Sequence, residues 1–186
     1  VYKRQVHYRQ GDSDEDRTAY GEVVLAAIGR VPNTDADWFR SSGLKLDERG
    51  YVTVDGYGRT NLDGVWALGD ITPGHALAHR AFEQGITIAE KIAGADPKPV
   101  IDDTVPQVVF SFPEAASVGL TLDQAKARED VVEPKETAYP MLSNARMLMS
   151  GEGGSMTVVS GAFANNPDMQ VVLGAVSYTH LTLPTI

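Results

Sequence analysis

The chain of 186 residues contains no cysteine, which excludes disulfide bonds, thiolate metal sites and thiol catalysis by its own side chains. Long hydrophobic runs are also missing. The longest, residues 23–28, has six residues, whereas a membrane-spanning helix needs about 20. No apolar segment follows the basic start, so we expect no signal peptide.

Basic residues are too few to balance the acidic ones, because 16 Lys and Arg stand against 25 Asp and Glu and the net charge is −9. This balance argues against binding to nucleic acid or to an anionic membrane. Hydrophobic residues make up 42% and charged residues 22%, both near the averages of globular proteins. We therefore expect a globular, cytoplasmic protein.

The two ends of the chain look foreign to the rest. One codon set for residues 1–5, GTG TAT AAG AGA CAG, has the reverse complement CTGTCTCTTATACAC. Read from its third base, that strand encodes Val-Ser-Tyr-Thr, the sequence of residues 176–179. A library adapter resembling a transposon end would explain both ends; the alternative is coincidence between two short strings. We interpret residues 1–5 and 176–186 as translated adapter and exclude them from fold prediction.

Between these ends, apolar runs and helical patterns follow one another. Residues 22–29 and 65–68 are short apolar runs, and their length predicts buried strands rather than helices. Residues 6–10 alternate weakly, which predicts another strand. Apolar and small residues at helical spacing predict a helix over residues 76–93, and Gly94 is placed to end it.

The composition changes near Asp103. Residues 105–112 are β-branched and aromatic, which predicts a strand. Thr121 followed by Gln124 forms a capping box, which predicts the start of a short helix. Further strands are expected at residues 158–159 and 171–173.

The stretch with the clearest chemical content ends in Gly69 and Asp70. A glycine has no Cβ to obstruct a ligand, and ligands of open α/β sheets bind at the carboxyl ends of strands. The Asp70 carboxylate could accept hydrogen bonds from sugar-like hydroxyls, each worth ~1.5–3 kcal/mol. The helix that follows directs its positive end toward the same crevice and would stabilise a ring system that gains negative charge. The arrangement predicts a cradle for the polyol and ring of a flavin.

Several segments resemble the flavoprotein disulfide reductases, which depend on a pyridine nucleotide. The resemblance covers nearly all of residues 20–175, and the order and spacing of its motifs are most similar to dihydrolipoyl dehydrogenase. The matching segments are residues 27–33, 59–70, 76–81, 105–114 and 116–121.

The resemblance implies FAD and NAD as cofactors and assigns residues to each. Asp70 is expected to bind the ribitol hydroxyls of FAD, and Gly29 to lie against NAD at the end of the last strand of the NAD domain. The flavin is expected to be lined, partly through backbone groups, by Ala76, Leu77, Ala78 and His79. The implied reaction passes electrons from dihydrolipoamide through an active-site disulfide and FAD to NAD+.

An α/β fold in three partial domains is also implied. Residues 6–33 would close a Rossmann-like NAD-binding domain, residues 34–103 would form the C-terminal part of a similar FAD-binding domain, and residues 104–175 would begin an α+β dimerisation domain. The parent is expected to be a homodimer. Its substrate is expected to be a small thiol or a lipoyl domain, within a 2-oxo acid dehydrogenase complex.

The chain departs from the family in three respects. It lacks the redox cysteine pair and the C-terminal His-Glu base, and its nearest approach to a nucleotide-binding glycine turn, residues 151–156, lacks the last glycine. We interpret residues 151–156 as a hairpin turn. We therefore assign no catalytic residue and expect the chain to be inactive by itself.

Other interpretations stay open. Mycothione reductase, mercuric reductase and soluble transhydrogenase share the architecture, and a non-catalytic flavin-binding or dimerisation module is a candidate of another class. His75 and His79 have the spacing of zinc ligands on a helix, but no third ligand is evident, and no metal site is predicted.

Overall fold

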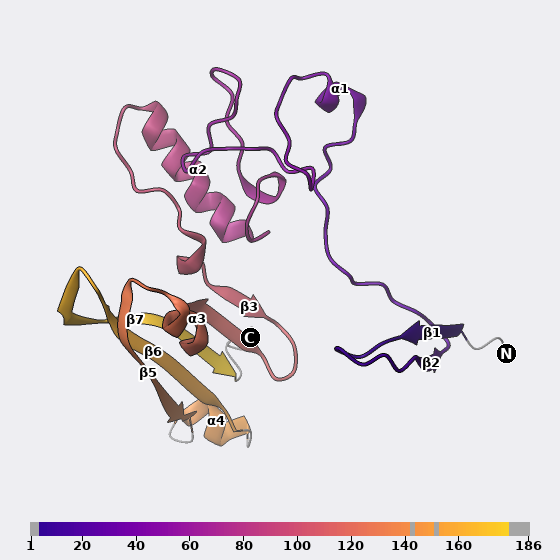
Figure 1. The fold of residues 1–186 in the computed structure, drawn as a ribbon, viewed down its shortest axis with the longest axis vertical. Coiled ribbons are helices and arrows are strands. Elements are labelled where there is room, and N and C mark those ends of the chain that lie inside the picture. The colour runs from indigo at the N-terminus through magenta and orange to yellow at the C-terminus, as the bar shows by residue number, and fades with distance from the viewer. Residues whose placement is uncertain (1–3, 142–143, 151–152, 179–186) are drawn as a thin grey trace. The chain divides into compact units, whose positions relative to one another are not determined.

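A computed structural model of the chain describes residues 4–141, 144–150 and 153–178 (Figure 1). The chain divides into two compact units, Val1–Val31 and Pro32–Ile186. The division falls close to the domain boundary predicted after residue 33. The second predicted boundary, at residues 103–104, lies inside the larger unit.

The N-terminal unit contains a two-stranded antiparallel sheet. Strand β1 (Arg4–Tyr8) pairs with β2 (Arg17–Gly21), which confirms a strand near the predicted position. The buried strand predicted over residues 22–29 is wrong, since the backbone from Val23 to Val31 is irregular. Its side chains are exposed, with Leu25 at 87% and Ile28 at 98%. A buried strand needs neighbours on both edges, and the only strands described in this unit pair with each other.

Turns and isolated bridges dominate the chain from Pro32 to Leu77, where the only α-helix is the short α1 (Asp37–Arg40). The turn at Asp47 is closed by its own carboxylate, which accepts hydrogen bonds from the backbone of Arg49 and Tyr51, both at 2.9 Å. The buried strand predicted over residues 65–68 is also wrong: it is reduced to one bridge, between Arg59 and Trp66. Val65 is 40% exposed, because no second neighbouring strand pairs with it in the part of the chain that the structure describes.

Helix α2 (Ala78–Ile92) confirms the main predicted helix, although it begins two residues later than residue 76. Leu77 is extended and offers no side-chain cap, so nothing holds the preceding residues in a helical turn. Gly94 ends the helix as predicted, at a φ of 86°. Its N–H donates to Lys91 O and that of Ala95 donates to Glu90 O, the paired bonds of a Schellman motif. Neither α2 nor any other helix of the described residues is long and apolar enough to cross a membrane.

The C-terminal part is a five-stranded sheet in the order β3-β4-β7-β6-β5, with every pair antiparallel. The strands confirm β structure at the positions predicted from residue 105 onward, although β3 covers only three residues of the predicted 105–112. Their bounds are β3 (Gln107–Val109), β4 (Ala115–Gly119), β5 (Val131–Pro140), β6 (Ser155–Phe163) and β7 (Asn166–Tyr178).

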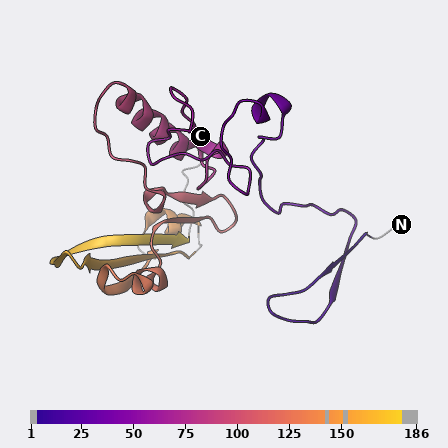
Figure 2. The ribbon, with the colours of Figure 1, turned by 45° about the horizontal axis from the view of Figure 1, so that its top comes forward.

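Helix α3 (Leu122–Ala127) covers one face of this sheet (Figure 2). Its predicted capping box is confirmed, since the Thr121 hydroxyl accepts from the Gln124 N–H at 3.2 Å and the Gln124 side chain accepts from the Thr121 N–H at 2.9 Å. Beneath the helix lies the core of the sheet. Its buried members are Ala125, Val131, Val159 and Leu173.

Two sequence interpretations concern the ends of strands. The hairpin turn predicted over residues 151–156 lies partly outside the described residues, which omit 151–152; Ser155 and Met156 belong to β6, and helix α4 (Ala145–Ser150) precedes this stretch. The turn between β6 and β7 lies at residues 164–165. Of the residues interpreted as adapter, 4–5 belong to β1 and 176–178 to β7, whereas 1–3 and 179–186 lie outside the described residues. That interpretation stays a prediction.

Candidate functional site

Asp70 lies on a short turn that the rest of the chain holds rigidly. The turn is the 3-10 helix η1 (Gly69–Ile71), and it begins with Gly69 in the left-handed region at a φ of 74°. The buried Gly69 donates its N–H to Gln84 Oε1 of α2 at 2.8 Å, and Thr72 donates its hydroxyl to Gly69 O at 2.8 Å. Thr72 is only 2% exposed. The backbone under Asp70 is therefore fixed from both sides.

The Asp70 side chain itself is exposed. Among the described residues it makes no hydrogen bond or ion pair, although backbone groups of the neighbouring Gly69, Ile71 and Thr72 are hydrogen-bonded. An aspartate held on a rigid turn with an unoccupied carboxylate is suited to accept hydrogen bonds from a polar ligand.

The start of α2 lies a few residues farther along the chain. Its first N–H groups have no partner within the helix, Leu77 supplies no side-chain cap, and no acidic residue occupies the first turn. Ala76, Ala78 and His79 are exposed and Leu77 is half-buried. The positive end of the helix dipole is thus open to a group that carries or gains negative charge.

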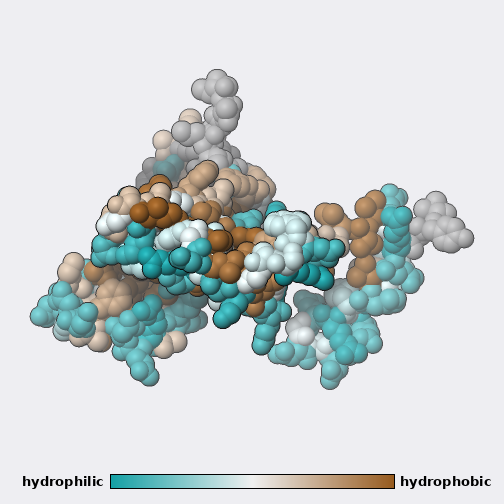
Figure 3. Space-filling model, turned by 90° about the horizontal axis from the view of Figure 1, so that it is seen from above, coloured by the Kyte–Doolittle hydropathy of each residue, from teal (hydrophilic) through white to brown (hydrophobic). Residues whose placement is uncertain are grey.

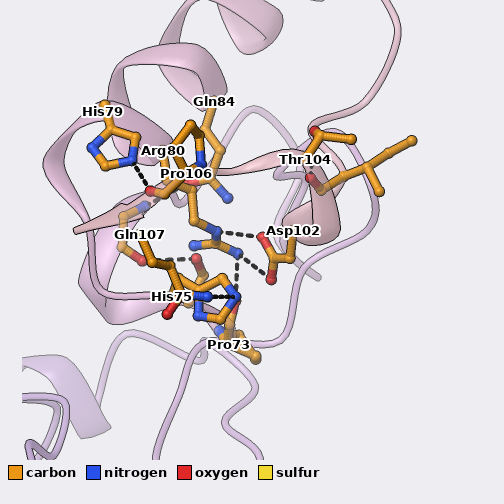
Figure 4. Close-up of polar contacts among 12 residues, drawn as sticks. Pro73, His75, His79, Arg80, Gln84, Asp102, Thr104, Pro106 and Gln107 are labelled. Atoms are coloured by element: carbon orange, nitrogen blue, oxygen red, sulfur yellow. Dashed lines mark hydrogen bonds and ion pairs between the residues drawn. The ribbon is translucent and has the colours of Figure 1, made fainter. Parts of the chain in front are cut away.

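The two histidines near this helix start turn toward another segment of the same unit (Figure 4). His79 Nε2 lies 2.7 Å from the carbonyl oxygen of Pro106. Since a carbonyl only accepts, Nε2 carries the proton. Gln107 donates its side-chain amide to His75 Nε2 at 3.2 Å. The Nε2 atom of His79 is therefore engaged by the backbone of Pro106.

The described residues contain no group of three or more His, Cys, Asp or Glu side chains arranged to hold a metal ion.

Arg80 is a structural residue that sequence inspection missed. Its side chain is 6% exposed and pairs with Asp102, with Nε to Oδ1 at 2.6 Å. Nη2 also donates to the carbonyl oxygen of Pro73 at 2.6 Å. A charged residue beside Ala78 and Ala81 on a small-residue helix face could have drawn attention to Arg80. No sequence pattern pointed to Asp102.

Two surface hollows lie close to these elements. One, of about 540 Å³, is lined by His79, Arg80, Glu83 and Thr87 of α2 and by residues 98–101 and 104–106. The other, of about 690 Å³, is lined by residues 59–66 with Lys91 and Ile92. Asp70 lines neither of them.

Lys91 donates to Asp96 at 2.7 Å, and this bond raises the pKa of Lys91 and lowers that of Asp96.

Gly29 belongs to the N-terminal unit, whereas the elements just described belong to the larger unit. Its φ is 126°, and an added Cβ would meet no atom within 4 Å. Residues 23–31 form no strand, so Gly29 does not end a strand, contrary to the expectation from the resemblance.

The Asp70 turn and the start of α2 lie in a region that matches a known class of proteins. Residues 3–85 match the family described as pyridine nucleotide-disulphide oxidoreductase. This part of the chain is similar to members of that family, which are flavin-dependent enzymes that act on sulfur groups. The match confirms the resemblance drawn from the motifs.

Among members of this class, dihydrolipoyl dehydrogenases are similar to the chain. The enzyme of Geobacillus stearothermophilus is 43% identical over 135 residues, which cover 72% of this chain and 28% of that protein. The enzyme of Cupriavidus necator is 40% identical over 151 residues, which cover 80% of this chain and 31% of that protein. The chain thus spans about a third of the length of the curated relatives it matches.

Solved structures agree with this assignment. LpdA from Mycobacterium tuberculosis is 30% identical, with a TM-score of 0.74 over 95% of this chain and 39% of that one. The flavoprotein disulfide reductase RclA from Escherichia coli has a TM-score of 0.70 over 96% of this chain and 39% of that one. At 24% identity, this second likeness concerns the fold alone.

Proposed function

We propose that the chain is part of a dihydrolipoyl dehydrogenase, which oxidises dihydrolipoamide to lipoamide and reduces NAD+ to NADH. The observation that carries the proposal is the Asp70 turn: an exposed, unpaired carboxylate on a backbone locked by Gln84 and Thr72, followed by the uncapped start of α2. The names of the relatives favour this member of the family over the others.

The residues present fit FAD. In the proposal, Asp70 accepts hydrogen bonds from the ribitol hydroxyls, each worth ~1.5–3 kcal/mol because the acceptor is charged. The backbone of Ala76, Leu77, Ala78 and His79 lies along the flavin ring, and the first N–H groups of α2 stabilise negative charge on it. Bound FAD supplies electron transfer between a dithiol and a nicotinamide. These residues bind and orient; none of them exchanges electrons.

The remaining parts of the proposal concern the rest of the enzyme. Gly29 is proposed to approach NAD, where a glycine allows a backbone to lie close to a dinucleotide. The parent is proposed to be a cytoplasmic homodimer that accepts lipoyl-domain thiols in a 2-oxo acid dehydrogenase complex. Rossmann-like topology of the parent's cofactor domains is part of the same proposal.

No residue of the chain can supply the reactive disulfide, because the chain has no cysteine. We therefore expect no turnover by the chain alone. The experiment that tests the function is a chimera in which residues 32–175 replace the matching region of the Geobacillus stearothermophilus enzyme, which contributes the redox and base residues. The chimera is expected to purify with FAD and to form NADH from dihydrolipoamide.

The substrate panel separates the members of the family. Activity with dihydrolipoamide, and none with mercuric ion or with NADPH and NAD+ as a transhydrogenase pair, would support the proposal. Loss of FAD from the chimera, with a folded protein by circular dichroism, would refute it.

Asp70→Ala in the chimera tests the carboxylate. Removing one charged acceptor is expected to weaken FAD retention by about 10- to 100-fold, measured as flavin released during dialysis. Asp63→Ala is the matched control, because Asp63 is also exposed and precedes the same turn. Equal flavin content in both variants would count against the role of Asp70.

A further inference from the structure

Two neighbouring aspartates form ion pairs with arginines from different parts of the larger unit. They belong to the 3-10 helix η2 (Asp102–Thr104). Asp102 binds Arg80 of α2 through both oxygens, at 2.6 and 3.3 Å. Asp103 lies 3.7 Å from Arg128, which follows α3. The segment that joins α2 to the five-stranded sheet is thus held by an ion pair on each side.

The two ion pairs differ greatly in environment. The Arg80 side chain is 6% exposed, whereas that of Arg128 is 40% exposed. An exposed and long ion pair contributes little, but a buried guanidinium needs its partner, because losing one leaves an uncompensated charge. Among the described residues Asp102 is the one acidic partner of Arg80, and Nη1 of Arg80 is buried without a hydrogen bond. The guanidinium therefore depends on Asp102.

The same guanidinium holds the loop between Asp70 and α2. Nη2 of Arg80 donates to Pro73 O at 2.6 Å. The next residue, Gly74, has a φ of 117°, and a Cβ there would collide with the side chains of Arg80 and Asp102. Because Arg80 itself lies in the first turn of α2, one buried group ties both ends of the loop formed by residues 73–79.

Two more hydrogen bonds join this loop to the chain that follows η2. His75 accepts from Gln107, and His79 donates to Pro106 O, so that residues 102–107 run along the loop (Figure 4). Residues 102–107 lead directly into β3, the edge strand of the sheet. The backbone proposed to face the flavin is thus held mainly by the stretch that begins the sheet.

We propose that Arg80 is a positioning residue for FAD: the ion pair of its buried guanidinium with Asp102 fixes the loop 73–79 against residues 102–107, so that retention of the flavin depends on the seating of the five-stranded sheet. The inference rests on the proposed function, in which the backbone of this loop contacts the flavin. Arg80 acts through the loop and touches no reacting atom.

The test uses the chimeric holoenzyme and compares Asp102→Asn with Asp103→Asn, each of which removes one negative charge. Asp102→Asn is expected to speed FAD dissociation by about 10- to 100-fold, less than for a fully buried charge pair because the Asp102 side chain is 38% exposed, and Arg80→Met to do the same. Asp103→Asn is the matched control and is expected to leave dissociation unchanged. Amide hydrogen exchange of residues 74–79 should accelerate in the first two variants and not in the control.

Rescue separates positioning from general damage to the fold. Arg80→Lys keeps a cation near Asp102 and should recover part of the flavin retention, while the double variant Arg80→Met/Asp102→Asn should lose no more than either single variant. The flavin still bound should show an altered absorbance and fluorescence in Arg80→Met. FAD dissociation unchanged in Arg80→Met, or equally fast in Asp103→Asn, would overturn the proposal.

The outcomes also separate this inference from the proposed function. If the unchanged chimera binds no FAD, the function fails, and amide exchange alone then decides whether the Arg80–Asp102 pair holds the loop. If the chimera binds FAD and the Arg80 variants bind it equally well, the function stands and the positioning role fails.

Discussion

The five-stranded sheet and the segments 22–29 and 65–68 contain the same types of apolar residues, but they differ in how far these residues are buried. In the sheet, apolar residues are buried, with Val159 at 3% and Leu173 at 9% exposure. In residues 22–29, Leu25 and Ile28 are almost fully exposed. Antiparallel neighbours can be joined by a short hairpin, whereas parallel neighbours need a crossover of about a dozen residues or more. Every strand of the sheet finds an antiparallel neighbour, including β4 and β7, which lie far apart in the chain, whereas no described strand pairs along residues 22–29.

The largest expected effect follows directly from this comparison. Large hydrophobic side chains lie on the surface of the chain (Figure 3), among them Leu25, Ile28 and Phe82. Exposed apolar patches and unpaired strand edges promote association. We expect the isolated chain to aggregate and to bind a hydrophobic dye strongly, as measured by light scattering and dye fluorescence. The chimera, which sets residues 32–175 within a whole enzyme and leaves out Leu25 and Ile28, should bind far less dye. A monomeric isolated chain that melts cooperatively and holds yellow flavin would contradict this expectation.

The second prediction tests whether the sheet is as well packed as its pairing indicates. Leu173 belongs to the core under α3, whereas the adjacent Val172 points to the other face and is 70% exposed. Leu173→Ala is expected to lower the free energy of unfolding by ~2–5 kcal/mol. Val172→Ala should change it by less than ~0.5 kcal/mol. Urea unfolding of the chimera, followed by circular dichroism, measures both; equal losses would show that this core is not packed as described.

Local sequence patterns predicted the elements whose partners lie within a few residues. Thr121 and Gln124 cap each other, and Gly94 ends α2 through bonds that span one turn. Such interactions are complete in a short stretch of sequence, so they could be predicted without knowledge of the fold. The strand predicted over residues 65–68 required neighbours that no local pattern supplies, and only the Arg59–Trp66 bridge forms.

The residues of the candidate site also differ in whether a local sequence pattern predicts them. Asp70 and the start of α2 were found because a glycine, an acidic residue and a helix follow one another in sequence. The ion pair between Arg80 and Asp102 was missed because its partners are 22 residues apart and meet only in the folded chain. Gln84, which fixes Gly69 from 15 residues away, was missed for the same reason. Residues that present a ligand group were therefore predictable, whereas residues that hold it in place were not.

The third prediction concerns the helix that covers the sheet. Thr121→Ala removes the hydroxyl that accepts from the Gln124 N–H and is expected to lower the free energy of unfolding by about 1 kcal/mol. Thr121→Ser keeps the hydroxyl and should lose much less. Urea unfolding of the chimera measures the two variants side by side. If both lose the same amount, the methyl group rather than the capping box stabilises this end of α3.

The smallest effect is expected where charges meet at the surface of the sheet. Arg128 donates to Asp130 at 2.6 Å, and this hydrogen bond holds the pKa of the Asp130 carboxyl below its ordinary value of 3.8. The unfolded state therefore binds a proton more readily than the folded state does. The stabilisation is present above the ordinary pKa and is lost as the pH falls through the lowered one. Asp130→Asn should be slightly less stable than the parent near neutral pH, and the difference should disappear in acid.

Glu129→Gln, a change of the neighbouring carboxylate, is the control and should leave the acid limb unaltered in urea unfolding at a series of pH values. A constant difference between Asp130→Asn and the parent across that series would show that the ion pair does not couple to folding.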